Sequence, residues 1–132
     1  MGLIAGPPAA HAASEETLCG FTYPTPDDFS VTAGSKVTAT PGASGVVDLR
    51  MYTDAASEAG YDQRFGVTWA NLDTGRSGVA EENARVQGPE TILAIPGVTT
   101  EPGRIAFVLS ASNHGSDQNH TYGDCSAEYV VP

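Results

Sequence analysis

The sequence predicts an all-β protein, built as an antiparallel β-sandwich of about seven to nine strands. Three observations lead to this fold. Apolar and polar residues alternate through nearly every ordered segment, pairs such as Pro-Gly and Ala-Gly separate those segments, and no stretch carries a convincing helical period. Alternation puts every second side chain on one face of a strand, and short strands divided by turns favour a sandwich. A small β-barrel is the competing architecture, because alternation alone does not separate the two.

The clearest alternation predicts strands in four segments, which are residues 46–53, 65–71, 104–111 and 125–131. In the second segment Phe65, Val67 and Trp69 share one face. We therefore expect Trp69 in the core, as in immunoglobulin-like sandwiches, where a tryptophan packs near the disulfide. This makes an immunoglobulin-like sandwich the expected form. Weaker alternation predicts further strands at residues 18–22, 29–32, 36–40, 77–80, 84–87 and 91–95.

The connections follow from turn chemistry. Residues 54–62 are predicted to cross between the two sheets, with one helical turn capped by Asp54. Residues 67–79 predict a β-hairpin whose tip carries Asp73 and Gly75. Proline presets a turn and glycine permits positive φ, so proline–glycine pairs predict the other turns. These pairs lie at residues 41–42, 96–97 and 102–103.

Two cysteines lie near opposite ends of the chain. Cys19 falls in the first predicted strand and Cys125 in the last. Their placement predicts one disulfide that encloses nearly the whole domain, and therefore an oxidising compartment. In the chain-entropy model a loop of this length contributes about 4 kcal/mol to stability.

The first residues resemble the end of an export signal. Residues 1–12 are small and apolar, and Ala10-His11-Ala12 carries small residues at the two positions that a signal peptidase recognises. We expect cleavage before Ala13, a single domain over residues 13–132, and a secreted or cell-envelope location. An ordinary alanine-rich, disordered N-terminus is the alternative.

Composition limits the classes of partner. The 132 residues carry 16 acidic and 6 basic side chains, a formal net charge of −10, and one lysine. Such a surface repels nucleic-acid phosphates and anionic lipids, so neither nucleic-acid binding nor membrane insertion is expected. The remaining partners are an unknown protein or a small ligand, with no resident cofactor predicted.

The best local cluster of chemistry-bearing side chains lies in residues 113–120. His114 and His120 flank Asp117 in a segment predicted to join two strands. Imidazole and carboxylate groups at short spacing are ligands for zinc or copper, so His114, Asp117 and His120 are a candidate metal site. The spacing matches no established ligand motif, and a polar turn alone would select the same residue types.

Other predicted loops supply candidate contact residues. These are Tyr61, Arg64, Asp73 and Arg76, with Tyr61 expected to be exposed. No catalytic constellation accompanies them: the serines lack the spacing of a nucleophile elbow, and the paired acids are adjacent and therefore point apart. The sequence predicts a protein that is not an enzyme.

The chain resembles the small secreted β-sandwich proteins of actinobacteria. The shared features are the Ala10-His11-Ala12 site, one cysteine near each end, a hairpin containing Trp69, and few lysines. The resemblance implies an immunoglobulin-like fold. The actinobacterial chromoproteins that carry enediynes share this form but typically hold two internal disulfides, so their ligand is not carried over.

Three functions are consistent with these features. The first is a secreted, non-enzymatic binding module that contacts a protein through loops at one end of the sandwich or through an exposed sheet edge. The second is carriage of a metal or small ligand by the 113–120 loop or by a cavity between the sheets. The third is a hydrolase inhibitor, which would need a rigid protruding loop such as residues 96–103.

Overall fold

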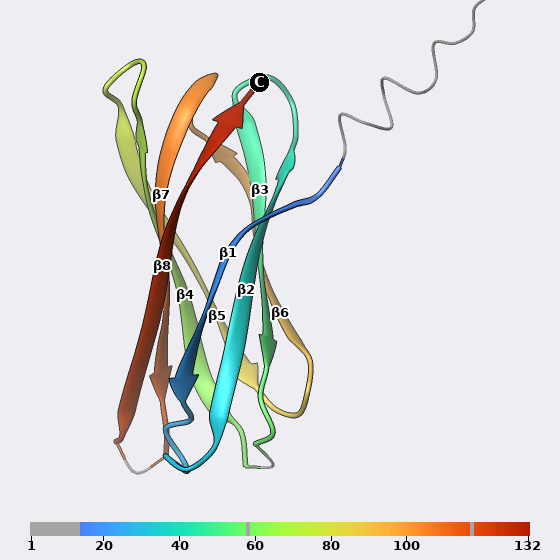
Figure 1. Cartoon of the computed structure of the whole chain (residues 1–132), viewed down its shortest axis with the longest axis vertical. Helices are drawn as coiled ribbons and strands as arrows, with labels where there is room; N and C mark the ends of the chain where they lie inside the picture. The colour runs from blue at the N-terminus through green and yellow to red at the C-terminus, as the bar shows by residue number, and fades with distance from the viewer. Residues whose placement is uncertain (1–13, 58, 117) are drawn as a thin grey trace, which may run out of the picture.

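The computed structural model describes residues 14–57, 59–116 and 118–132, and folds them into two packed antiparallel sheets (Figure 1). Sheet A has the strand order β1-β2-β3-β6, and sheet B has the order β5-β4-β7-β8. The predicted sandwich is confirmed over the barrel alternative, because the strands form two separate four-stranded sheets. The domain has the two-layer architecture of immunoglobulin-like proteins. The predicted signal-like segment, residues 1–12, lies outside the described residues.

Eight strands make up the sandwich among the described residues. They are β1 (Glu16–Pro24), β2 (Thr32–Pro41), β3 (Val46–Asp54), β4 (Tyr61–Asn71), β5 (Ser77–Val86), β6 (Thr91–Thr99), β7 (Gly103–His114) and β8 (His120–Val131). The end that holds the β7–β8 turn is the lower end of Figure 1, and the β4–β5 hairpin rises at the upper end. The chain crosses between the sheets three times, from β3 to β4 and from β5 to β6 at the lower end, and from β6 to β7 at the upper end.

Several predicted strands need correction. Residues 29–31 form a turn, in which the Val31 amide donates to the Asp28 carbonyl, and β2 begins only at Thr32. The predicted strands 77–80 and 84–87 are one continuous strand, β5. The described residues of the β3–β4 crossing contain no helical turn. Among the described residues, no helix has the length and hydrophobicity needed to cross a membrane.

The predicted turn at Pro96-Gly97 is instead a bulge inside the edge strand β6. The β3–β6 register shifts between Val47 and Leu49. Asp48 Oδ1 accepts a hydrogen bond from the Gly97 amide at 2.7 Å, and Gly97 has φ of 68°. An edge strand tolerates the missing amide hydrogen of Pro96, and glycine accommodates the positive φ at the bulge.

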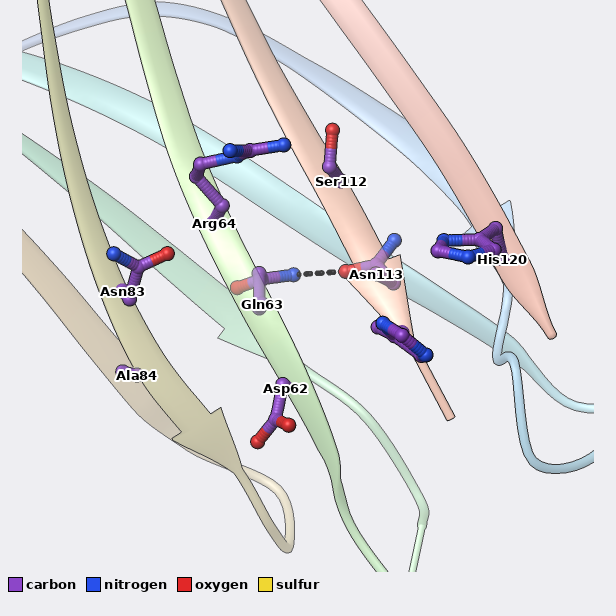
Figure 2. A pocket seen from close by; sticks show the side chains of 9 residues that line it. Asp62, Gln63, Arg64, Asn83, Ala84, Ser112, Asn113 and His120 are labelled. Atoms are coloured by element: carbon purple, nitrogen blue, oxygen red, sulfur yellow. Dashed lines mark hydrogen bonds between the residues drawn. The ribbon is translucent and has the colours of Figure 1, made fainter. Parts of the chain in front are cut away.

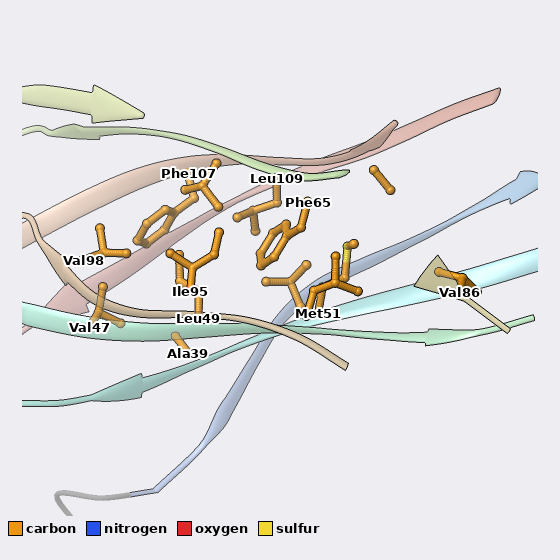
Figure 3. Close-up of a cluster of buried hydrophobic side chains, with 14 of the residues drawn as sticks. Ala39, Val47, Leu49, Met51, Phe65, Val86, Ile95, Val98, Phe107 and Leu109 are labelled. Atoms are coloured by element: carbon orange, nitrogen blue, oxygen red, sulfur yellow. The ribbon is translucent and has the colours of Figure 1, made fainter. Parts of the chain in front are cut away.

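Inward-facing side chains of all eight strands form or border one apolar core (Figure 3). Phe65 and Phe107 from sheet B pack with Leu49 and Met51 from sheet A, and all four are buried. Trp69 is only half-buried, against the edge of this core. The Trp69 ring lies against Gly78. A Cβ atom at residue 78 would be only 2.7 Å from the indole, so a larger side chain would clash there.

The disulfide closes one side of the sandwich. Cys19 of β1 and Cys125 of β8 are bonded, with their Cα atoms 6.2 Å apart, so the edge strands of the two sheets are covalently linked. Below the disulfide, Gly123 leaves room for an aromatic ring. A Cβ atom there would lie 2.6 Å from Phe21 Cδ2, which explains why a glycine stands in the middle of β8.

A closed ring of hydrogen bonds lies between the sheets at the lower end. The Thr53 hydroxyl donates to Gln63 Oε1 at 2.8 Å, and Gln63 Nε2 donates to the Tyr23 hydroxyl at 2.6 Å. Each hydroxyl has a single hydrogen to donate, so these two bonds also fix the donor in the other two hydrogen bonds of the ring. Ser35 must donate to Thr53 at 2.8 Å, and Tyr23 must donate to Ser35 at 3.1 Å. Four buried polar side chains are thereby satisfied.

We expect the disulfide to be a major source of stability. Replacing both cysteines, Cys19→Ala with Cys125→Ala, should lower the free energy of unfolding by about 2–5 kcal/mol, because the unfolded chain gains the freedom of a very long loop. Guanidinium denaturation at constant pH measures the change. A loss below about 1 kcal/mol would show that the packed edges hold without the bond.

The hydrogen-bond ring gives a second stability prediction. Thr53→Val removes one donor and one acceptor, and leaves the Ser35 hydroxyl hydrogen and Gln63 Oε1 without their partner in the ring. This should cost about 1–3 kcal/mol. The control is Thr68→Val, a change of the same kind at an exposed position of β4, which should stay within about 0.5 kcal/mol of wild type. Equal effects of the two substitutions in urea denaturation would contradict the structural importance of the ring.

Candidate functional site

The lower part of the outer face of sheet B carries two rows of mostly polar side chains. The strand register sets four side chains in a row across β5, β4, β7 and β8, in the order Arg85, Asp62, His114 and His120. The row above it is Asn83, Arg64, Ser112 and Tyr122. Alternation along each strand turns all eight outward, because each row is two residues from the next.

Six of these eight side chains, all except Arg85 and Tyr122, line an open depression of about 410 Å³, which we call the lower groove. Figure 2 shows Arg64 and Asn83 on neighbouring strands, with the Arg64 side chain extending toward Ser112 of β7. Gln63 and Asn113 lie behind the groove, where Gln63 Nε2 donates to Asn113 Oδ1 at 2.8 Å. Gln63 therefore joins the floor of the groove to the buried hydrogen-bond ring.

Charges around the lower groove are balanced by ion pairs. Arg85 Nη1 lies 3.2 Å from Asp62 Oδ1, and Arg85 Nη2 donates to the Ala59 carbonyl at 3.0 Å. Arg64 Nη1 lies 3.9 Å from Glu81 Oε2. All these side chains are exposed, so each pair contributes little to stability. Their effect is to keep the groove close to neutral on a protein of net charge −10.

The structure brings together two of the three predicted metal ligands. His114 ends β7 and His120 begins β8, and they stand directly opposite each other. Their ring centroids are 4.3 Å apart with a tilt of 42°. Asp117 lies outside the described residues. Within residues 14–57, 59–116 and 118–132, no three His, Cys, Asp or Glu side chains form a group that could hold a metal.

The predicted contact residues do not share one surface. Tyr61 and Arg64 both lie in β4 and not in a loop, and Tyr61 is fully buried. Asp73 and Arg76 lie in the β4–β5 turn at the opposite end of the sandwich. The expectation of an exposed Tyr61 was wrong, because β4 begins at this residue and turns its ring inward.

The environment of Tyr61 explains its structural role. Its hydroxyl approaches the Tyr23 hydroxyl at 3.4 Å, and since Tyr23 donates to Ser35, Tyr61 is the donor of this pair. Burial is the main cause of a strongly raised pKa of the Tyr61 phenol, and the bond to Tyr23 adds to it. Tyr61 therefore stays neutral and inside the domain.

At the upper end, Asp73 and Arg76 serve local structure. Asp73 Oδ2 accepts a hydrogen bond from the Arg104 amide at 2.9 Å, and Arg76 Nη1 lies 3.1 Å from Glu101 Oε2. These contacts tie the β4–β5 turn to the β6–β7 connection. Asn71 completes the junction, since its buried Nδ2 donates to the Thr100 carbonyl at 2.9 Å.

The inhibitor hypothesis required a protruding loop at residues 96–103. In the structure most of this segment belongs to β6 and the start of β7, and Thr100 between them is fully buried. The segment is held by amide hydrogen bonds from Thr100 and Glu101 to the Gly45 carbonyl, each 3.0 Å long. It therefore lacks the projection that insertion into an enzyme cleft requires.

Sequence reasoning missed a set of exposed apolar side chains on sheet B. Val79 is 78% exposed, Val130 66%, Tyr122 57% and Val108 47%. The register places all four on the outer face of sheet B. The signal was present, because each occupies an outward position of an alternating strand, where a polar residue is the usual choice.

The outer face of sheet A differs, because its side chains are engaged with one another. Glu15 Oε2 accepts hydrogen bonds from the hydroxyls of Thr38 and Tyr52, both at 2.6 Å. Lys36 Nζ lies 5.4 Å from the centroid of the Tyr52 ring. The two hydroxyl bonds, that of Thr38 first, lower the pKa of the Glu15 carboxyl. Tyr52 is thus occupied within the domain.

With this geometry in view, the chain was compared with known proteins. A scan of protein-family models, a search of curated proteins and a search of solved structures each found no significant match.

The pKa of Glu15 provides a test of the sheet A contacts. Tyr52→Phe removes one of the two hydroxyl bonds, so the carboxyl pKa should rise toward its ordinary value of 4.5. Because the folded-state pKa is depressed, the Glu15 contribution to stability is present above the unfolded-state pKa and is lost as the pH falls through the folded one. Carboxyl-carbon NMR titration measures the shift.

The matched control for this titration is Tyr122→Phe. The Tyr122 hydroxyl donates to Asp124 Oδ2 at 3.2 Å on sheet B and does not reach Glu15. The pKa of Glu15 should be unchanged in this variant. A Glu15 carboxyl that titrates identically in wild type and Tyr52→Phe would disprove the proposed contact.

Proposed function

We propose that this protein is an extracytoplasmic, non-enzymatic interaction module that binds another protein through the outer face of sheet B. The observation that carries the proposal is the concentration of exposed apolar side chains there. Four of them, Val79, Val108, Tyr122 and Val130, lie on this one face. Apolar groups gathered on one surface and bordered by polar residues are typical of protein–protein contact sites.

The charge distribution supports the same face. Outward positions of sheet B carry three of the six basic side chains, Arg64, Arg85 and Arg104, against four of the sixteen acids. The four acids are Asp62, Glu81, Asp124 and Glu128. The face is therefore nearly neutral, while the rest of the chain carries most of the net charge of −10. A protein partner approaching here avoids the repulsion that other surfaces impose on an acidic partner.

The shape of the face favours a folded protein over a small ligand. Many of its central residues have short side chains, including Gly66, Thr68, Ala106 and Ser110. Short side chains leave a broad and rather even sheet surface on which a flat partner can pack. The partner chemistry that fits is a surface of mixed apolar and neutral polar groups, with a carboxylate or amide able to meet the exposed arginines.

The proposed location outside the cytoplasm is supported by the disulfide. The Cys19–Cys125 bond joins the two sheets, and such structural disulfides persist in oxidising compartments. The signal-like composition of residues 1–12 agrees with export.

A pair of charge insertions tests the binding face. Val108→Glu places a carboxylate at the centre of the outer face of sheet B, and should weaken binding to a purified partner at least tenfold. Ile92→Glu is the matched control, because Ile92 is 51% exposed on the outer face of sheet A, close to the 47% exposure of Val108. It should change the affinity by less than twofold.

The partner is first identified by affinity capture from envelope proteins of the producing organism, and is then purified for titration by calorimetry. Sedimentation of the chain alone shows whether a second copy occupies the face instead. The proposal fails if Val108→Glu and Ile92→Glu bind the purified partner equally well, or if only Ile92→Glu loses binding. Circular dichroism of both variants establishes that they are folded.

A further inference from the structure

Two of the three histidines of the chain are paired in space. His114 and His120 are Cα partners at the end of the β7–β8 ladder, with ring centroids 4.3 Å apart. Both side chains are exposed at the edge of the lower groove. The third histidine, His11, belongs to the signal-like segment and lies outside the described residues.

The backbone beneath this pair is held in place from inside the domain. Asn113 Nδ2 donates to Thr121 Oγ1 at 3.2 Å, which links the residues next to the two histidines across the ladder. Asn113 Oδ1 in turn accepts from Gln63 at 2.8 Å. The Gly115 amide donates to the Asn119 carbonyl at 2.9 Å and closes the turn. Only side-chain rotation remains to bring two ring nitrogens to one point.

We propose that His114 and His120 form a two-histidine chelate for a divalent transition metal, with copper(II) as the preferred ion. Imidazole nitrogen suits copper, nickel and zinc, and a given nitrogen site binds copper(II) most strongly among the divalent first-row metals. Magnesium and calcium demand oxygen ligands and are not expected to bind. Water completes the coordination, since no third ligand-type side chain among the described residues joins the pair.

The surroundings favour a cation at this position. Asp62 of β4 is the Cα partner of His114 of β7, whereas His120 pairs with His114 from β8. The Asp62 carboxylate is already 3.2 Å from Arg85 Nη1. Asp62 thus offsets the charge of Arg85 near the pair and is not counted as a ligand. The net charge of −10 raises the local concentration of cations around the whole domain. This metal site lies at the lower end of the outer face of sheet B, three outward rows from Val108 at the centre of the proposed protein-binding face.

Copper titration of the full chain with its disulfide intact tests the site. At pH 7.5 calorimetry should show one copper(II) per chain, and the electron paramagnetic resonance spectrum should show coupling to nitrogen. His114→Ala and His120→Ala should each weaken binding at least tenfold.

His11→Ala is the matched control and should change copper affinity by less than twofold. If instead His11→Ala abolishes binding, or if His114→Ala binds as tightly as wild type, the chelate does not exist and the two rings merely stack. If the wild-type chain does not bind copper(II) stoichiometrically, the chelate likewise does not exist. Val108→Glu should leave copper binding unchanged, so failure of the metal site and failure of the protein-binding face are distinguished.

Discussion

The hydrogen-bond ring at the lower end of the sandwich links the two sheets and, through Gln63 and Asn113, the core to the lower groove. Gln63 occupies an inward position of β4, where an apolar side chain would be usual, and contacts both sheets through its amide. An unpaired amide buried there would cost a large part of the stability of a small domain. With Tyr23, Ser35 and Thr53 as partners it is satisfied, and its second hydrogen reaches Asn113. This contact joins β4 and β7 beneath the lower groove, in addition to the backbone ladder between the two strands.

The two outer faces of the sandwich have different capacities for recognition. On sheet A, Glu15 ties together Thr38 and Tyr52, so polar groups there are satisfied within the chain. On sheet B, arginines are paired with acids and the apolar side chains between them have no cover in the monomer. A single acidic domain thus presents one nearly neutral face. This difference between the two faces favours sheet B as the contact surface. It arises because different side chains occupy the outward positions of the two sheets.

Sequence alternation predicted most strands and failed where polar residues occupy inward positions. Tyr61 was placed in a loop because Gln63 interrupts the apolar pattern that begins there, although both face the core. The two halves of β5 were separated by the polar run at residues 81–83. Glu82 is the inward residue of this run, and an edge strand can present it there because water still reaches it. Alternation identifies a strand through its buried apolar side chains. It therefore fails where inward side chains are polar, either because they form hydrogen bonds or because they lie on an edge strand.

The sequence by itself determined the all-β class, the covalent link between Cys19 and Cys125, and the hairpin around Asp73. Each of these depends on local alternation, on a unique pair of thiols, or on strands adjacent in the chain. Only the tertiary structure decided that β3 pairs with β6 and β4 with β7, that Arg85 and Asp62 extend the histidine row, and that four exposed apolar residues share one face. Those relations arise from contacts between residues distant in sequence, which depend on the packing of both sheets together and leave no periodic signal in the chain.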